Sequence, residues 1–343
     1  MKIDRKVFRA SAAAAFCGFL VLDGGARNAA GSPLLTNPPE YTGGFGGTVI
    51  QPALGELMVH SFPTTPLSKG LFETKVTPAY FTVSKKMGEP SQGQGNYYID
   101  ETVKGPGVSV GVLYGFSEHW GMSALAAYAQ DKGDISVGNS YVQNLGGPGQ
   151  VLANNGTASD RGVTLGVNLI YDHFSGENFR LPMMLGVSYL NYSGSAETDI
   201  NFNATPGHAG HAGLASEQYS NSGVGFTAGL APQFNTGPFR WVFLIFAAEA
   251  VSSTKGSYRE TDLTTGQTAQ DPTWSDDSHG VEGGGITAVY RPWNVSFTYL
   301  APFLSSGPDR HLDVSVYSLT WTKKWGGETS KSGAEKKRSE TKN

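Results

Sequence analysis

Apolar and polar positions alternate along short segments between Glu73 and Trp325. The period of the alternation is two, which is typical of β-strands that have one apolar face. Tight turns and long polar connections join the segments in turn. The tight turns cover 117–120, 175–178, 236–238 and 291–294, and the longer connections cover 86–104, 132–160, 195–220, 252–278 and 304–310.

This pattern predicts an all-β fold, a transmembrane antiparallel up-and-down β-barrel with short periplasmic turns and long extracellular loops. The predicted barrel is 73–325. An even number of strands places both of its ends in the periplasm, with every long loop outside. We expect ten strands, at 74–85, 106–117, 120–131, 161–173, 178–193, 221–235, 239–251, 280–291, 294–303 and 311–324.

The two faces of these strands differ in chemistry. The segment 161–173 alternates Val163, Leu165 and Val167 with small or polar residues, so we expect its apolar face to meet lipid and its other face to line the lumen. The lumen should be narrow, because eight strands leave an interior just filled by side chains and sixteen leave a water channel. The predicted lumen residues are Ser109, Ser117, Ser123, Thr164, Asn168, Asp172, Ser188, Thr227, Ser296 and Thr298.

Aromatic residues gather on both sides of the tight turns. Trp and Tyr favour the boundary between membrane and water, where the ring is half buried and its polar tip stays hydrated. Core aromatics of a soluble β protein would explain their number but not their position beside every short turn. The predicted interface girdle is Tyr114, Phe116, Trp120, Tyr171, Phe174, Trp241, Tyr290, Trp293 and Trp325.

Both ends of the chain differ from the barrel. Residues 1–30 combine a basic start, an apolar run and small residues, which predicts a secretory signal peptide. The Pro- and Gly-rich segment 31–72 carries apolar residues, so we expect it to plug the lumen or to add two strands and make twelve. The tail 326–343 is Lys-rich and polar, which predicts a disordered periplasmic segment.

Composition narrows the classes of partner. Only 16% of residues are charged, the mean hydropathy is −0.25 and the formal net charge is −4, so no basic surface for nucleic acid is expected. The single cysteine, Cys17, lies within the predicted signal peptide, so we expect no disulfide in the mature protein. The expected partners are outer-membrane lipid and a small-molecule solute. The sequence does not indicate an oligomeric state.

Over residues 73–325 the chain resembles the outer-membrane β-barrel proteins of Gram-negative bacteria as a class. The run from Tyr114 to Trp120, Tyr-Gly-Phe-Ser-Glu-His-Trp, is similar to the periplasmic hairpins of many small barrels. Such proteins usually end on an aromatic residue, whereas a tail follows Trp325 here. The resemblance implies a location in the cell outer membrane.

Three groups of residues have spacings that are similar to those of chemical sites. Gly107–Gly111 matches the nucleophile-elbow pattern around Ser109, but it lies inside a predicted strand, whereas that motif needs a strand-to-helix turn. His208, His211 and Glu217 have a spacing that suits a metal ion, in a loop without rigid support.

The third group is Asp276, Asp277 and His279, at the outer rim. The resemblance draws attention to it, because ten-stranded outer-membrane proteases pair acidic residues with a histidine there. Asp131 and Asp134 lie at a comparable height, but no second acidic pair with a matching context is visible in the sequence. We therefore expect solvated charges, and no enzyme, cofactor or metal site.

The function predicted from the sequence is a narrow channel or transporter for a small solute, preferably apolar. Wide ion-selective porins carry opposed rings of charge, which the predicted lumen lacks. One alternative is a structural or surface-binding barrel that acts through its long extracellular loops. A hydrolase at the rim is the third interpretation.

Overall fold

The computed structural model describes residues 61–90, 96–138, 142–144, 150–176, 178–202, 211–264, 266, 268–305 and 310–326. The predicted signal peptide, most of the segment 31–72 and almost all of the tail lie outside these residues. The strands are β1 (Phe72–Pro90), β2 (Asn96–Gly115), β3 (Trp120–Gly138), β4 (Val142–Asn144), β5 (Gln150–Ser175), β6 (Phe179–Phe202), β7 (His211–Leu230), β8 (Gln233–Thr236), β9 (Phe239–Asp262), β10 (Thr268–Tyr290), β11 (Val295–Ser305) and β12 (Arg310–Trp325).

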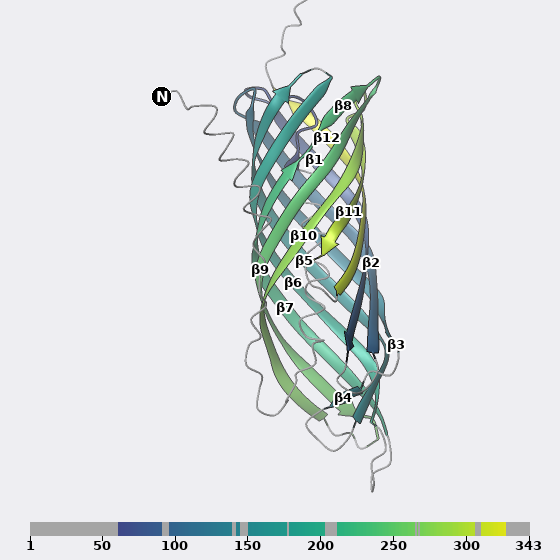
Figure 1. Ribbon diagram of the computed structural model, residues 1–343. Coiled ribbons are helices and arrows are strands. Elements are labelled where there is room, and N and C mark those ends of the chain that lie inside the picture. Colours follow the sequence, from purple (N-terminus) through teal and green to yellow (C-terminus); the bar gives the residue numbers. More distant parts are fainter. Residues whose placement is uncertain are drawn as a thin grey trace, which may run out of the picture.

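These strands form one closed antiparallel barrel (Figure 1). Of the twelve strands, β4 and β8 have only three and four residues, and the other ten form the wall. Pairing of β1 with β12 joins the two ends of the chain, and pairing of β5 with β6 completes the ring. Closure leaves no free sheet edge, so the backbone N–H and C=O groups of the wall can form hydrogen bonds with neighbouring strands and do not need water. The predicted ten-stranded barrel is confirmed.

The two short strands arise from local interruptions. The predicted strand 221–235 is divided in two, because β7 ends at Leu230, just before Pro232, which has no N–H to donate to the ladder. After this break β8 lies at the tight-turn end and pairs with both β6 and β9. β4 pairs with β5 at the other end of the barrel.

Most strands extend further on the extracellular side than the sequence pattern indicated. β5 has 26 residues, β6 and β9 have 24 each, and β10 has 23, whereas a tilted strand crosses a bilayer in about 9–11 residues. The added parts are polar on their outer face, so they show no apolar alternation. They are still paired: Asp160 lies opposite Gly194, and Gly194 lies opposite Tyr219. Much of each predicted long loop is therefore paired strand.

An apolar belt surrounds the outside of the barrel. On β5 it runs from Val163 to Tyr171, nine residues, which is within the about 9–11 residues that a tilted strand needs to cross a bilayer. Exposed apolar surface of this extent is not found on soluble monomers, and lipid must cover it. No helix in the described ranges is long and apolar enough to cross a membrane.

Aromatic side chains border the belt at both ends. At the tight-turn end the predicted girdle residues are exposed or half-buried on the outside, and the rings of Trp120 and Tyr171 are in contact at a tilt of 44° (centroids 4.7 Å apart). At the extracellular end there is a second ring that the sequence analysis did not identify: Tyr80, Tyr128, Tyr189, Tyr299 and Tyr317. The belt and its two girdles identify the chain as a transmembrane barrel of the outer-membrane type.

Replacing Val167 with arginine tests the belt directly. This side chain is 46% exposed at the middle of the β5 belt, so the charge would lie in hydrocarbon and should cost about 2–4 kcal/mol of unfolding free energy. Urea titrations of protein refolded in lipid vesicles measure the loss. The matched control is Ser195→Arg on β6, on the outer face beyond the belt, which should change stability little. Equal losses for the two variants would contradict the assignment of the belt.

Candidate functional site

The lumen brings together nearly all the predicted lumen residues. Nine of them are buried in the wall, with side chains between 0% and 5% exposed, and their outward neighbours are exposed; Asn168 is 2% exposed beside Val167 at 46%. Ser117 is the exception. It lies in the turn between β2 and β3, where its hydroxyl accepts hydrogen bonds from the backbone of His119 (3.2 Å) and Trp120 (3.0 Å). The lumen prediction for Ser117 was wrong, because β2 ends at Gly115 and does not reach position 117 as expected.

Residues 61–71 enter the barrel at its tight-turn end and form what we call the plug. Their apolar side chains Phe62, Leu67 and Leu71 are buried. Gly70 N donates to the Gly115 carbonyl (2.8 Å), and Gly115 N donates to the Leu71 carbonyl (2.8 Å), which fixes the plug to the end of β2. A Cβ on Gly115 would lie 2.4 Å from the Ser68 carbonyl oxygen, so only glycine permits this approach.

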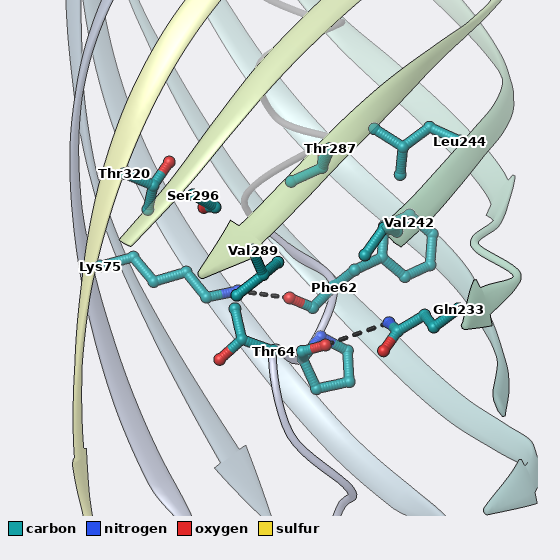
Figure 2. Close-up of a pocket in the computed structure, with 11 residues that line it drawn as sticks. Phe62, Thr64, Lys75, Gln233, Val242, Leu244, Thr287, Val289, Ser296 and Thr320 are labelled. Atoms are coloured by element: carbon teal, nitrogen blue, oxygen red, sulfur yellow. Dashed lines mark hydrogen bonds between the residues drawn. The ribbon is translucent and has the colours of Figure 1, made fainter. Parts of the chain in front are cut away.

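Three consecutive plug carbonyls are bound by side chains of the wall. Lys75 Nζ on β1 donates to the Phe62 carbonyl, Gln233 Nε2 on β8 donates to the Pro63 carbonyl (3.2 Å), and Arg240 Nη1 on β9 donates to the Thr64 carbonyl. Figure 2 shows the first two bonds converging from opposite sides of the plug. Buried carbonyls need such partners, so these side chains allow an irregular segment to sit inside the barrel.

Glu73 on β1 also binds the plug, through its carboxylate. Its carboxylate accepts from Thr64 N (3.2 Å), Thr64 Oγ1 (3.1 Å) and Thr65 Oγ1 (2.5 Å), and it lies 3.9 Å from Lys75 Nζ. The side chain is fully buried. A buried carboxylate is stable only when paired and hydrogen-bonded, and here the plug supplies most of the donors.

Deeper in the barrel the plug meets the predicted lumen residue Asn168. Its Nδ2 donates to Ser61 Oγ (2.7 Å) and lies 3.4 Å from Ser123 Oγ, while its Oδ1 accepts from Thr227 Oγ1 (3.3 Å). These partners come from the plug, β3 and β7, so one side chain on β5 connects two parts of the wall with the plug.

A buried ion pair reinforces the wall beside the plug. Arg180 Nε on β6 donates to Asp172 Oδ2 on β5 (2.9 Å), Nη2 reaches the same oxygen, and Nη1 donates to Gln233 Oε1 (3.2 Å). Gln233 in turn binds the Pro63 carbonyl. The ion pair and the plug therefore share a hydrogen-bonded network.

The space left between plug and wall is small. A cavity of about 20 Å³ lies beside Phe62 and Thr64, against Lys75, Val242 and Thr287 (Figure 2). This volume holds about one water molecule. With the plug seated, this gap is too small for a solute larger than water.

Beyond the plug, toward the extracellular side, the lumen has two kinds of wall. Phe81 and Val83 on β1, Val103 on β2, and Val314 and Val316 on β12 form a continuous apolar patch, since Phe81 pairs with Val316 and Val83 pairs with both Val314 and Val103. The apolar residues of β12 change from one face of the strand to the other along its length. This change requires no bulge. Val314 and Val316, nearer the extracellular end, face the lumen, whereas Tyr317, Leu319 and Trp321, nearer the tight turns, face lipid.

Carboxylates occupy the other wall of this part of the lumen, between the plug and the extracellular end, which we call the upper lumen. Asp131 on β3 lies opposite Asp160 on β5, and Asp131 Oδ1 accepts from Asp160 N (3.0 Å). The Tyr219 hydroxyl donates to Asp160 Oδ1, and Glu217 is buried two residues further along β7. The upper lumen is therefore apolar on one side and acidic on the other.

The three candidate chemical groups are not assembled into a site among the described side chains. Ser109 lies in the middle of β2, so the nucleophile-elbow geometry is absent there. Asp276, Asp277 and His279 lie within β10 opposite Ser253, Ser252 and Ala250, and only their backbone is described. Asp131 points into the lumen whereas Asp134 is exposed on the outside.

Of the three metal candidates, only Glu217 has a described side chain. Glu217 is buried in the lumen, His208 is outside the described residues and only the backbone of His211 is described. Among the described residues no three His, Cys, Asp or Glu side chains are placed to hold a metal ion.

No family model and no curated protein matches the sequence. Solved barrels with similar folds include the outer membrane protease OmpT from Escherichia coli, at 10% identity, TM-score 0.41, and coverage of 76% of this chain and 98% of that one. Another is the outer membrane protein OprG from Pseudomonas aeruginosa, at 14% identity, TM-score 0.31, and coverage of 76% and 98%. The attachment invasion locus protein Ail of Yersinia pestis has 15% identity, TM-score 0.25, and coverage of 74% and 99%. At these values the likeness concerns fold alone, and function has to follow from the residues of this lumen.

Proposed function

We propose that this barrel is a narrow, gated outer-membrane channel for a small solute, and that residues 61–71 are its gate. The observation that carries the proposal is the binding of three consecutive plug carbonyls by Lys75, Gln233 and Arg240. A segment that served only to fill space would be held by apolar contacts. Here polar bonds to its backbone hold it in addition to the buried Phe62, Leu67 and Leu71, and water can replace such bonds when the plug leaves.

The chemistry of the upper lumen favours one class of solute. The apolar patch around Phe81 and Val103 suits an apolar body, while the carboxylates of Asp131, Asp160 and Glu217 disfavour anions. The proposed solute is therefore a small molecule with an apolar body that is neutral or positively charged.

Locking the plug in place tests the gate. Ser61→Cys with Asn168→Cys places two thiols where Ser61 Oγ and Asn168 Nδ2 lie 2.7 Å apart. The predicted mature chain has no other cysteine. We expect the bridged protein, closed by a disulfide or a short bifunctional thiol reagent, to lose uptake of apolar amines into proteoliposomes. Reduction of the disulfide should restore uptake.

The single variants Ser61→Cys and Asn168→Cys, treated in the same way, are the matched controls and should keep their uptake. Full uptake by the bridged protein would overturn the gate, because the solute would then be passing a fixed plug.

A second candidate function is surface binding, and the length of the strands favours it. β5, β6, β9 and β10 continue well past the belt, so the barrel has an extended extracellular rim, at the lower end in Figure 1. Removal of the rim of β9 and β10 should abolish a binding activity and leave uptake unchanged.

A further inference from the structure

Three basic side chains gather on the outer face of the barrel, over neighbouring strands. Lys104 on β2 lies directly opposite Lys132 on β3, and Arg161 on β5 lies opposite Gln130 of β3, two residues before Lys132. All three side chains are exposed. Neighbouring strands are about 4.8 Å apart, so the three cations face one patch, which we call the basic patch.

The height of the basic patch relative to the bilayer follows from the strands that carry it. On β3 the belt ends at Tyr128 of the extracellular girdle, and Lys132 follows four residues later. On β5 the belt ends at Val163, and Arg161 is the next outward residue. The cations therefore lie at the level where the phosphate groups of the outer leaflet begin.

A hollow accompanies the cations. A space of about 740 Å³ is lined by the exposed side chains of Lys104, Pro106, Gln130, Lys132, Arg161 and Gln218. Its remaining lining includes several serines of β5 and β6, of which Ser193 Oγ accepts a long hydrogen bond from Arg161 Nε (3.5 Å). Cations, amides and hydroxyls around one hollow are the donors that a phosphate group needs.

The charge balance of the patch also favours an anion. Like charges directly opposite each other in a sheet are destabilising, as Lys104 and Lys132 are. Asp134 is on the same outer face, but the ion pairs found among the described residues do not include it. Asp131 and Asp160 border the hollow from the other side of the sheet, with carboxylates directed into the lumen.

We propose that the basic patch binds a phosphorylated lipid of the outer leaflet, with phosphate held by Lys104, Lys132 and Arg161 and acyl chains lying on the belt below. The adjoining belt supplies the argument for a lipid: Val163 and Tyr128 are exposed immediately next to the cations. A free anion would use the cations and leave this apolar surface unused.

The test uses full-length protein refolded in neutral detergent, with bound lipid measured by native mass spectrometry during titration with a bisphosphorylated glycolipid. Each cation near an anionic lipid contributes about fivefold in affinity, so Lys104→Gln/Lys132→Gln/Arg161→Gln should bind roughly 100-fold more weakly than the unchanged protein. The single variant Lys132→Gln should lose about fivefold, which keeps the test valid if the triple variant does not refold.

The matched control is Lys255→Gln. Lys255 is exposed on β9, at the same level of the barrel as Arg161, because Arg161 pairs with Ser193, Ser193 with Ser220, and Ser220 with Lys255. It lies three strands away from Arg161, outside the basic patch. Its replacement should leave binding unchanged. If the triple variant bound the glycolipid as tightly as the unchanged protein, the proposal would be overturned. The three cations would then serve to balance the negative charge of Asp131 and Asp160 on the other side of the wall. Displacement of the glycolipid by equimolar inorganic phosphate would also overturn it, in favour of a free-anion site.

Discussion

Replacing Asp172 with alanine should lower the free energy of unfolding by about 3–5 kcal/mol, because it leaves the Arg180 guanidinium buried without its counter-ion. Arg180 is 1% exposed and binds Asp172 through Nε and Nη2. The Gln233 amide oxygen, 3.2 Å from Nη1, accepts one hydrogen bond but carries no charge to replace the carboxylate. Removal of one member of a buried pair costs more than the pair itself contributes, since the charge that remains cannot be hydrated.

Urea unfolding of vesicle-embedded protein, followed by tryptophan fluorescence, measures this loss. Asp172→Asn keeps an acceptor for one of the two bonds and should lie between alanine and the unchanged protein. Asp134→Ala removes an exposed carboxylate from the same barrel and should change stability by no more than about 0.5 kcal/mol. A loss below about 1 kcal/mol for Asp172→Ala would show that water reaches Arg180, and the lumen at that level would then be open.

The barrel could be predicted because lipid imposes a strict alternation on every segment that crosses it. Val163, Leu165 and Val167 face outward on β5 as the sequence pattern indicated. Beyond the belt this constraint ends. Ser159 and Ser195 face outward in strands that remain hydrogen-bonded, and nothing in their polarity distinguishes them from a loop. The strand ends were therefore placed too early on the extracellular side.

The residues that hold the plug were not identified from the sequence. Glu73 and Lys75 alternate with the outward Phe72 and Val76, so the period of two does place them inside, and this signal was available. Arg180 and Arg240 stand next to tight turns, where a charge is ordinarily taken as an interface residue. Arg180 pairs with the nearby Asp172, but its link to the plug runs through Gln233, 53 positions away, and Arg240 binds the Thr64 carbonyl, 176 positions away. Local patterns cannot supply such distant pairings.

Replacing Glu73 with alanine should release the plug and open the channel. Thr64 and Thr65 would lose the three hydrogen bonds that they donate to the carboxylate. A bond to a charged group contributes about 1.5 kcal/mol or more, so the three bonds correspond to about 4.5 kcal/mol and a change of roughly 2,000-fold in the equilibrium between seated and released plug. Single-channel recording in planar bilayers should show the open probability rising by this factor, up to a continuously open state.

Glu73→Gln retains one acceptor oxygen and should give an intermediate open probability. Glu197→Ala, which removes an exposed carboxylate from the outer face of β6, should leave the recordings unchanged. An unchanged open probability in Glu73→Ala, with the barrel still refolded, would mean that the wall donors Lys75, Gln233 and Arg240 hold the plug without help from the carboxylate. The gate would then require displacement of those three bonds together, and the triple variant Lys75→Ala/Gln233→Ala/Arg240→Ala would become the one that opens it.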